Sequence, residues 1–310
     1  MHQIFVNANY DFVGKRRWFY IASAALIAIS LLSILVHGGL HYGIDFTGGT
    51  LIQVRYGKPV TVGDVRRGLD DIKLGSAVIQ QFGDPQEYLI RLPQGDQKPD
   101  QITPQIQAAL AKASGGAVEI RRVEFVGPQV GRDLQMQALY AVLAGMAGIL
   151  IYVAIRFDFR GGVISVAAIA HDVTVTLGAL SIFNLEMSLP VLAALLTIVG
   201  YSINDTIVIF DRIRESRGRG LRKGQTLADM VNTSINQTLS RTILTSFTTF
   251  MAAFVLFLFG GEVLRDFAFA LVIGIIMGTY STVAAASLLV DWETWSRSRQ
   301  RSPRKVPAKA

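Results

Sequence analysis

Long apolar segments alternate with short polar connections along most of the chain, and this pattern predicts a membrane protein. A bilayer core of about 30 Å requires roughly 20 apolar residues in a spanning helix. Four of the segments that reach this length contain no charged residue, whereas the third contains His171 and Asp172 and the fourth contains Asp205. The fold expected is membrane α-helical, with six transmembrane helices at Trp18–Val36, Leu134–Ile155, Val163–Phe183, Leu189–Phe210, Thr242–Gly260 and Phe267–Val290.

A polar insertion of residues 38–132 separates the first two apolar segments and predicts a small domain outside the membrane. Its elements follow the order strand, helix, strand, strand, helix, strand, which is the order of an α+β ferredoxin-like fold. Thr61 and Asp64 form a helix-start signal, and Ser114–Gly116 forms a stop signal. The predicted strands are Ile44–Tyr56, Ala77–Phe82, Glu87–Leu92 and Val118–Val126, and the predicted helices are Val62–Ile72 and Pro104–Ala113.

Composition agrees with a membrane location. The chain is 51% hydrophobic and 17% charged, whereas soluble domains carry about 25% charged residues. It has no cysteine, which excludes disulfides, zinc–thiolate sites, iron–sulfur clusters and thiol catalysis. The first apolar segment follows three basic residues, as a signal peptide does, but its length of about 19 residues exceeds a signal core. We read it as a retained span.

Lysine and arginine gather in places that fall on one side of a six-span chain. They occur before the first span, in the second–third and fourth–fifth connections, and in the tail after Trp295. The outer connections at 184–188 and 261–265 hold one basic residue between them. Because cytoplasmic loops are enriched in Lys and Arg, both termini are predicted to be cytoplasmic and residues 38–132 extracytoplasmic. The net charge of +7 is then mainly a topology signal, and no nucleic-acid partner is expected.

The expected organisation has four parts. An N-terminal segment with the first helix covers 1–37, and the external domain covers 38–132. The other five helices cover 133–292, and a basic cytoplasmic tail covers 293–310.

Motifs for ATP or metal chemistry do not occur in the sequence. There is no G-x-x-x-x-G-K-[ST] phosphate loop, no H-E-x-x-H metal motif and no G-x-S-x-G nucleophile turn. The chain is therefore not expected to be an enzyme, to hydrolyse ATP itself or to hold a metal or cofactor.

Ionisable residues inside the membrane are the candidate chemistry. Asp205 lies six residues before Asp211, about 9 Å inside the cytoplasmic end of its helix. Arg241 begins the fifth span from the same side, so the depths of the two residues permit an ion pair. A pair that opens when Asp205 is protonated would switch the conformation of the helices. The alternatives are a static ion pair between two helices and an Arg241 that reaches the interface.

His171, Asp172 and Asn204 are further candidates. Asp172 lies about 14 Å along the third span, where a carboxylate could join a proton path. Adjacent helical residues point about 100° apart, so His171 and Asp172 need not face one cavity. Both could instead make polar contacts between helices. Asn204 could help to hydrate the neighbouring Asp205, or it could only satisfy the hydrogen bonding of that carboxylate.

Gly274 and Gly278 form a G-x-x-x-G pattern in the sixth span. Such small residues allow close helix approach, and packing is the role predicted here. A sliding or hinge surface is the alternative.

Several motifs together carry a resemblance that covers nearly the whole chain. They are YGIDFTGGT, FVGPQVGRDL, IRFDFRGG, AAIAHDVTVTLG, GYSINDTIVIFDRIRE, LSRTILTS and RDFAFALVIGIIMGTYST, in this order. The chain resembles the SecF family of bacterial protein-export membrane subunits, within the resistance–nodulation–division superfamily. The resemblance implies a partner, SecD, which would complete a pseudo-symmetric twelve-span unit beside the SecYEG channel, with YajC and YidC as neighbours and membrane lipids around them.

The resemblance also implies an activity and its residues. The unit would use the proton-motive force to pull translocating preproteins outward in the inner membrane. The aspartate of the S-x-N-D motif and the arginine of the S-R-T motif, which match Asp205 and Arg241, would take part in proton transport. A further carboxylate would come from SecD. The superfamily includes sodium-driven members, so the coupling ion stays open.

The stretch GIDFTGGT lies where the first span meets the external domain. With the family resemblance, Asp45, Phe46, Gly48 and Gly49 become a candidate coupling joint between the membrane core and that domain; a simple structural turn is the alternative. At the level of the whole chain, the alternatives are a small-molecule or lipid exporter of the same superfamily and a non-transporting assembly scaffold. A scaffold would not need Asp205 and Arg241.

Overall fold

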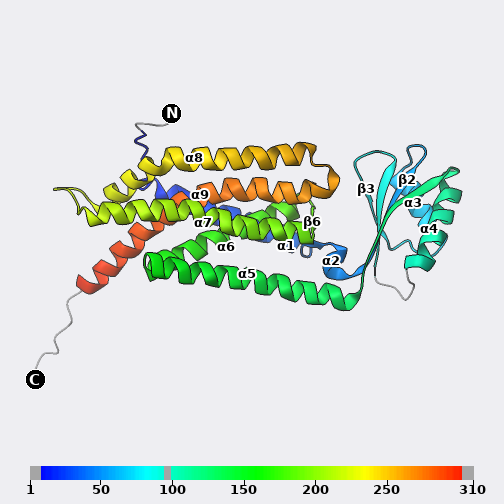
Figure 1. The fold of residues 1–310 in the computed structure, drawn as a ribbon, viewed down its shortest axis with the longest axis horizontal. Coiled ribbons are helices and arrows are strands. Elements are labelled where there is room, and N and C mark those ends of the chain that lie inside the picture. Colours follow the sequence, from blue (N-terminus) through cyan, green and yellow to red (C-terminus); the bar gives the residue numbers. More distant parts are fainter. Residues whose placement is uncertain (1–7, 94–98, 302–310) are drawn as a thin grey trace, which may run out of the picture.

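The computed structural model describes residues 8–93 and 99–301, and within them six long helices form one bundle. The helices lie roughly along a common axis, and the external domain is at one end of the bundle (Figure 1). This confirms the predicted membrane fold with six spanning helices. Their bounds are α1 Arg16–Val36, α5 Pro128–Arg156, α6 Phe159–Ile182, α7 Leu189–Gly218, α8 Leu227–Phe259 and α9 Glu262–Arg301.

Several helices extend beyond the apolar segments that predicted them. α7 continues past Phe210 to Gly218, and α8 begins at Leu227, well before Thr242. Thr226 explains the second start, because its side chain and that of Asp229 form a capping box at the first turn. α9 continues to Arg301, so the first part of the predicted basic tail is helical; residues 302–310 of that tail lie outside the described residues.

The helices differ in how much they are covered by the rest of the chain. About half of the apolar stretches of α6, α7 and α9 is buried, whereas only 6% of those of α1 and α5 is buried. Clusters of aliphatic side chains join α6, α7 and α9 over most of their length. These three helices are therefore the centre of the bundle, and the polar residues they carry lie inside the protein.

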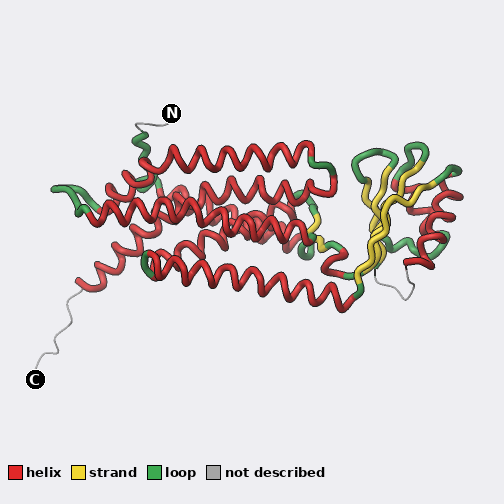
Figure 2. Tube along the Cα trace, viewed as in Figure 1, coloured by secondary structure: helices red, strands yellow, loops and turns green. Residues whose placement is uncertain are grey.

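The external domain is a four-stranded antiparallel sheet with two helices on one face. It comprises β2 Gly49–Tyr56, α3 Val62–Asp70, β3 Val78–Gln81, β4 Glu87–Leu92, α4 Pro99–Ser114 and β5 Val118–Val126. The strands lie in the order β3-β4-β2-β5, and the element order is that of the ferredoxin-like motif. Ile52, Val54 and Ile90 point to the helices and form the domain core with Leu69, Ile106 and Leu110. Figure 2 shows the strands between the helical bundle and α4.

The first predicted strand is partly wrong, because Ile44–Thr47 form a short helix, α2, and β2 begins only at Gly49. Gly48 and Gly49 have φ of 69° and 125°, which glycine adopts readily and other residues rarely do. They turn the chain from α2 into the sheet. A second feature was not predicted: β1 (His41–Tyr42) pairs in parallel with β6 (Glu186–Met187), which precedes α7.

Candidate functional site

Asp205 lies on α7 with only 2% of its surface exposed. One hydrogen bond to its carboxylate is present, from the Ser246 hydroxyl of α8 to Oδ2 at 3.1 Å. The Thr279 hydroxyl of α9 donates to Ser246 Oγ at 2.8 Å. This chain of hydroxyls joins three helices to one buried carboxylate.

Arg241 does not contact Asp205. It is exposed on α8, and within the described part of the chain no carboxylate oxygen lies within 4.0 Å of its guanidinium. Arg241 precedes Ser246 by five residues, or about 7.5 Å along the helix, and its charge acts on Asp205 only across that space. The structure therefore does not form the ion pair that the matching depths permitted, because depth does not fix the direction in which a side chain points.

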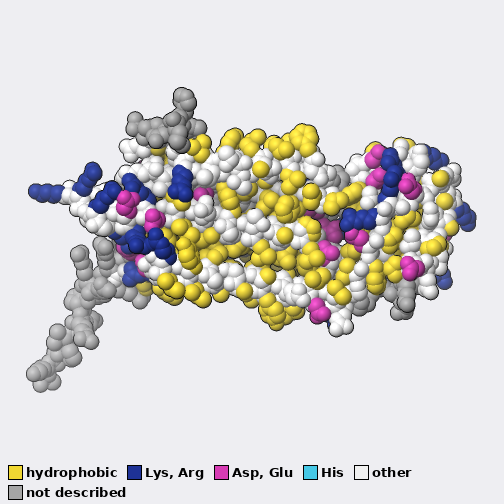
Figure 3. All heavy atoms as spheres, viewed as in Figure 1, with side chains coloured by type: hydrophobic (Ala, Val, Ile, Leu, Met, Phe, Trp, Pro, Cys, Tyr) yellow, Lys and Arg dark blue, Asp and Glu magenta, His cyan; other side chains and the backbone are white. Residues whose placement is uncertain are grey.

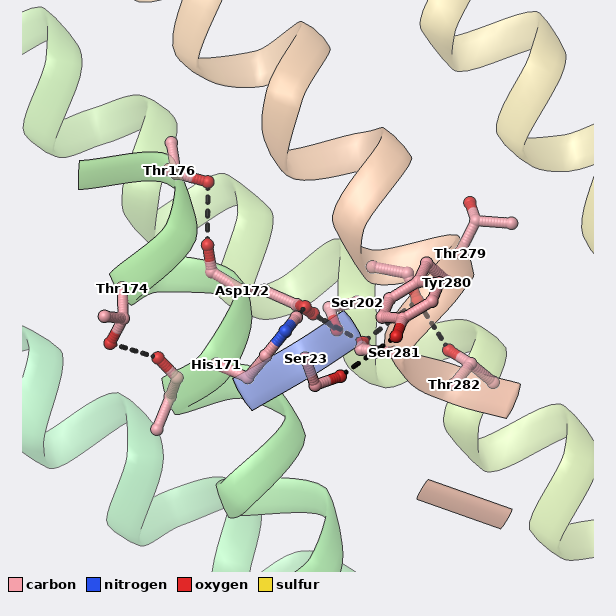
Figure 4. Close-up of polar contacts among 12 residues, drawn as sticks. Ser23, His171, Asp172, Thr174, Thr176, Ser202, Thr279, Tyr280, Ser281 and Thr282 are labelled. Carbon is pink, nitrogen blue, oxygen red and sulfur yellow. Dashed lines mark hydrogen bonds and ion pairs between the residues drawn. The ribbon is translucent and has the colours of Figure 1, made fainter. Parts of the chain in front are cut away.

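Asp172 is the centre of a second buried cluster, on α6, with 0% of its surface exposed. Its Oδ2 accepts hydrogen bonds from Ser202 Oγ of α7 at 2.6 Å and from Ser281 Oγ of α9 at 2.8 Å. Its Oδ1 lies 2.9 Å from Nδ1 of the adjacent His171. Figure 4 shows these side chains converging from three helices. The two neighbours in sequence do meet at one site, although their Cβ directions differ.

The two carboxylates belong to one polar band that crosses the bundle. Ser202 and Asp205 are three residues apart on α7, so they are neighbours on one helix face. On α9, Thr279 reaches toward Asp205 through Ser246, and Ser281 reaches Asp172. A buried carboxylate needs such donors, because leaving its oxygens unpaired in an apolar interior costs several kcal/mol. The folding of α7 against α9 supplies them.

Asn204 is placed away from this band. It is exposed on α7, while Ser202, Ile203, Asp205 and Thr206 around it are buried. Among the described residues, none makes a hydrogen bond with the Asn204 side chain. Within the described residues, Asn204 therefore donates no hydrogen bond to Asp205.

Gly274 and Gly278 lie where α9 meets α7. A Cβ at Gly274 would be 2.2 Å from Ile198 Cδ1, and one at Gly278 would be 3.2 Å from Ser202 Cβ. The helices can approach this closely only because both positions lack a side chain. Gly278 thereby brings Ser202 to the point where it donates to Asp172.

The stretch from Gly43 to Gly49 fastens the external domain to the bundle. Asp45 Oδ2 accepts a hydrogen bond from the Leu189 backbone N–H at the start of α7, at 2.9 Å. The Phe46 carbonyl accepts one from the Gln135 amide of α5 at 2.8 Å, and the Phe46 ring is 3% exposed. The Gly43 N–H donates to the Met187 carbonyl at 2.8 Å. This stretch thus contacts two helices, α7 and α5, at the end of the bundle that carries the α+β domain.

An ion pair that the sequence did not reveal crosses the same boundary. Arg91 of β4 pairs with Glu186, and the Glu186 backbone N–H donates to Asp266 Oδ2 at 3.0 Å. Burial lowers the pKa of Arg91, and the nearby Asp266 carboxylate opposes that shift. The only sign of this ion pair in the sequence is that Glu186 is the one acidic residue in the 184–188 connection.

These features define a class: a multi-pass membrane protein with buried carboxylates in its bundle and an α+β domain at one end of that bundle. In the described residues, no group of three or more His, Asp or Glu side chains is placed to hold a metal ion.

The comparisons with known proteins give the family. The model described as "Protein export membrane protein SecD/SecF, C-terminal" matches residues 105–295, and the SecD/SecF GG motif matches residues 33–60, which include Gly48 and Gly49. The protein translocase subunit SecF of Calditerrivibrio nitroreducens is 48% identical over 92% of this chain and 94% of its own length. That of Vibrio alginolyticus is 44% identical over 89% and 88%. The chain belongs to the SecF family of protein translocase subunits.

A solved structure agrees with this assignment. The crystal structure of SecDF from Thermus thermophilus, described as a translocon-associated membrane protein, is 42% identical and matches with a TM-score of 0.84. The match covers 93% of this chain and 39% of that chain, so this chain spans about two fifths of the SecDF polypeptide. The protein is therefore a multi-pass inner-membrane subunit with a role in protein translocation.

Proposed function

We propose that this chain works with a SecD-type partner to use the proton-motive force for late-stage preprotein translocation through the SecYEG channel, without hydrolysing ATP. The observation that carries the proposal is Asp205, a carboxylate 2% exposed in the membrane core, to which the described residues present one hydroxyl donor and no cation within 4.0 Å. Intramembrane carboxylates of this kind are costly and mark ion pathways.

Protonation of Asp205 changes what its oxygens can do. The ionised carboxylate accepts the Ser246 hydrogen bond, and the neutral acid carries a proton that it can donate instead. Because Ser246 also accepts from Thr279, a change at Asp205 alters the contacts of α7 with both α8 and α9. A proton that binds from one side and leaves to the other would thereby drive these helices between two arrangements.

The polar side chains that face out of the bundle are evidence for a partner subunit. Arg241 and Asn204 are exposed at the surface of the membrane helices. Side chains this polar are unstable against lipid tails and are normally covered by protein. We place the SecD-type subunit there, where it would supply the carboxylate for Arg241. This chain matches 39% of the SecDF chain of Thermus thermophilus, which leaves the larger part of that chain for such a subunit.

The orientation we propose follows the distribution of charge. On the face seen in Figure 3, Lys and Arg side chains gather at the end of the bundle away from the external domain, with an apolar surface between the two ends. By the preference of basic residues for the cytoplasm, that end is cytoplasmic, as are both termini. Residues of about 38–132 are then extracytoplasmic, where they would meet the emerging preprotein, with YajC and YidC as neighbours of the complex.

The junction of Asp45, Phe46, Gly48 and Gly49 is the coupling joint in this scheme. Asp45 and Phe46 contact the outer ends of α7 and α5 through the Leu189 N–H and the Gln135 amide. A movement of α7 at Asp205 would therefore be delivered to the first strand of the external domain.

Asp205→Asn tests the proposal. The amide has the same shape but cannot bind and release a proton. Export by the variant in the presence of a proton gradient should therefore be no greater than export without one. The measurement is preprotein translocation into inverted membrane vesicles that contain the complete translocase, with and without an imposed proton gradient. Asp211→Asn, on the exposed end of the same helix, should leave the stimulation unchanged.

Two outcomes contradict the proposal. Equal stimulation by the proton gradient in wild type and Asp205→Asn removes Asp205 from the coupling path. Stimulation of the wild type by a sodium gradient but not by a proton gradient assigns a different coupling ion.

A further inference from the structure

His171 is the one member of the Asp172 cluster whose hydrogen bonding is incomplete. Its side chain is 8% exposed, and its Nε2 atom is buried without any hydrogen-bond partner. Its Nδ1 atom lies 2.9 Å from Asp172 Oδ1. Buried polar atoms without partners are rare, and in a functional membrane core each calls for an explanation.

The two hydroxyl donors on Asp172 stabilise its ionised form, and it is the ionised form that decides which nitrogen of His171 carries the hydrogen. Ser202 and Ser281 both donate to Oδ2, as hydroxyls do to an ionised carboxylate. An ionised Asp172 makes Nδ1 the donating atom toward Oδ1, and the neutral imidazole then presents a free lone pair at Nε2. In this state the cluster holds one negative charge in the membrane core, and the part of the chain that the structure describes places no cation within 4.0 Å of it.

We propose that His171 and Asp172 form a second proton-binding centre, in which the proton is received at Nε2 of His171 while Asp172 stays ionised. The proton adds to the Nε2 lone pair and produces an imidazolium whose Nδ1–H remains bonded to Asp172 Oδ1; release returns the neutral imidazole. Proton uptake removes the net charge of the cluster, because the imidazolium and the carboxylate form an ion pair. This inference rests on the proposed proton coupling and assigns it an additional site.

The surroundings of His171 contain few other ionisable groups. From α9, the ring of Tyr280 lies 6.0 Å from the imidazole, centroid to centroid. From α7, Asp205 lies three residues beyond Ser202. The apolar stretch of α1 and residues 134–155 of α5 contain no charged side chain. The charge of the centre is therefore set mainly by His171 and Asp172 themselves.

Tyr280 gives the centre a route to the first helix. Its hydroxyl donates to the Phe19 carbonyl of α1 at 2.7 Å and lies 3.1 Å from Ser23 Oγ (Figure 4). An imidazolium beside the ring gains a cation–π interaction that a neutral imidazole lacks. Proton uptake at His171 therefore strengthens the contact between its ring and that of Tyr280, the residue that connects α9 to α1. In the sequence, α1 leads directly into the external domain.

Nitrogen NMR of the full chain, labelled on histidine and held in lipid nanodiscs, tests the proposal. The sequence has four histidines, and loss of one signal in His171→Gln assigns His171. Above neutral pH we expect an Nδ1–H tautomer with a bare Nε2, converting to the doubly protonated ring as the pH falls. In Asp172→Asn the doubly protonated ring loses the carboxylate that stabilises it, so its signal should weaken relative to wild type at the same pH.

A functional arm uses the same variants in gradient-driven vesicles. His171→Gln can still donate an amide hydrogen bond to Asp172 but cannot bind a proton at Nε2, so the pH dependence of export should flatten. His37→Gln, at the exposed outer end of α1, should keep the wild-type profile.

The proposal is overturned if the His171 signal shows the Nε2–H tautomer, or if it stays unchanged from pH 5 to pH 9. An unaltered pH profile in His171→Gln also contradicts it. If His171 titrates as expected while wild-type export ignores the proton gradient, the proton site stands and the proposed function fails, so the two results are separable.

Discussion

At the scale of single residues, the two buried carboxylates differ in how well the protein compensates them. Asp172 has two hydroxyl donors and a histidine, whereas Asp205 has one hydroxyl donor. Each donor to a carboxylate stabilises its ionised form. Of the two, Asp205 is therefore the carboxylate whose charge the described residues compensate less, which agrees with a group that exchanges its proton or receives a partner from another subunit.

Asp64 shows the opposite situation, outside the membrane. Hydrogen bonds from the N–H and hydroxyl of Thr61, with the Arg67 guanidinium beside it, lower the pKa of Asp64 from 3.8 to about 2. Because the pKa of Asp64 is lower in the folded state than in the unfolded state, the ionised carboxylate stabilises the folded state at pH values above about 4. This contribution is lost as the pH falls from about 4 to about 2. The start of α3 should therefore loosen in that range.

We predict that Asp64→Asn removes this pH dependence. Hydrogen exchange of the α3 amides, measured by mass spectrometry on the full chain in detergent, should show protection that falls between pH 4 and pH 2 in wild type. The variant should show lower protection that is constant across the range. Asp71→Asn, at the other end of the helix, serves as the control and should keep the wild-type profile. A variant that keeps the full pH dependence would contradict the capping role.

At the scale of elements, the contact between α7 and α9 decides where the polar band can form. Gly274 and Gly278 permit that contact, and Gly278 lies against Ser202. Gly145 on α5 offers a comparison within the same chain, because a Cβ there would meet nothing within 4 Å. Gly274 and Gly145 are alike in sequence, since each is a glycine in an apolar helix. They differ in the side chains that lie opposite them.

We predict opposite effects of alanine at these glycines. At Gly274, the added methyl meets Ile198, whose β-branched side chain is stiff in a helix, so overpacking should destabilise the protein by about 1–3 kcal/mol. At Gly145, alanine should be neutral or stabilising because it favours the helix. The measurement is the thermal unfolding midpoint of each purified protein in detergent. A midpoint for Gly274→Ala at or above that of Gly145→Ala would show that the contact is looser than described.

At the scale of the whole molecule, two bodies are joined at one boundary. The chain crosses it twice, before β2 and after β5, and Arg91 with Glu186 makes a third connection through side chains. Arg91 and Glu186 are 17% and 22% exposed, so the pair is partly shielded from water and ions. The pair is therefore placed to restrain the orientation of the external domain relative to the bundle.

We predict that Arg91→Ala broadens the distances between the two bodies. The chain has no cysteine, so spin labels can be attached at Lys112→Cys in the domain and Ile182→Cys in the bundle without further changes. Double electron–electron resonance should give a wider distance distribution in Arg91→Ala. The exchange Arg91→Glu with Glu186→Arg should restore the wild-type width.

Arg121→Ala is the matched control for that measurement. Arg121 pairs with Glu119 on the same strand, at 3.3 Å, and makes no connection to the bundle. Its removal should leave the distribution unchanged. An identical width in Arg91→Ala and wild type would show that the two chain crossings alone fix the orientation.

The sequence by itself determined the number of spans, the order of elements in the external domain and the candidate residues Asp172 and Asp205. Length of apolar runs, strand and helix periodicity, and the cost of a charge in a bilayer are local properties, and they can be read along the chain. The prediction of a strand was wrong at Ile44–Thr47, which form α2. The alternation over these four residues is too short to distinguish a strand from a helix.

Only the tertiary structure decided which side chains meet. Asp205 faces Ser246 and not Arg241, Asn204 points outward, and Asp172 joins His171 to hydroxyls from two other helices. Arg91 finds Glu186, 95 residues further along the sequence. These pairings depend on the rotation of each helix about its axis and on how closely the helices approach, and the packing of the whole bundle sets both.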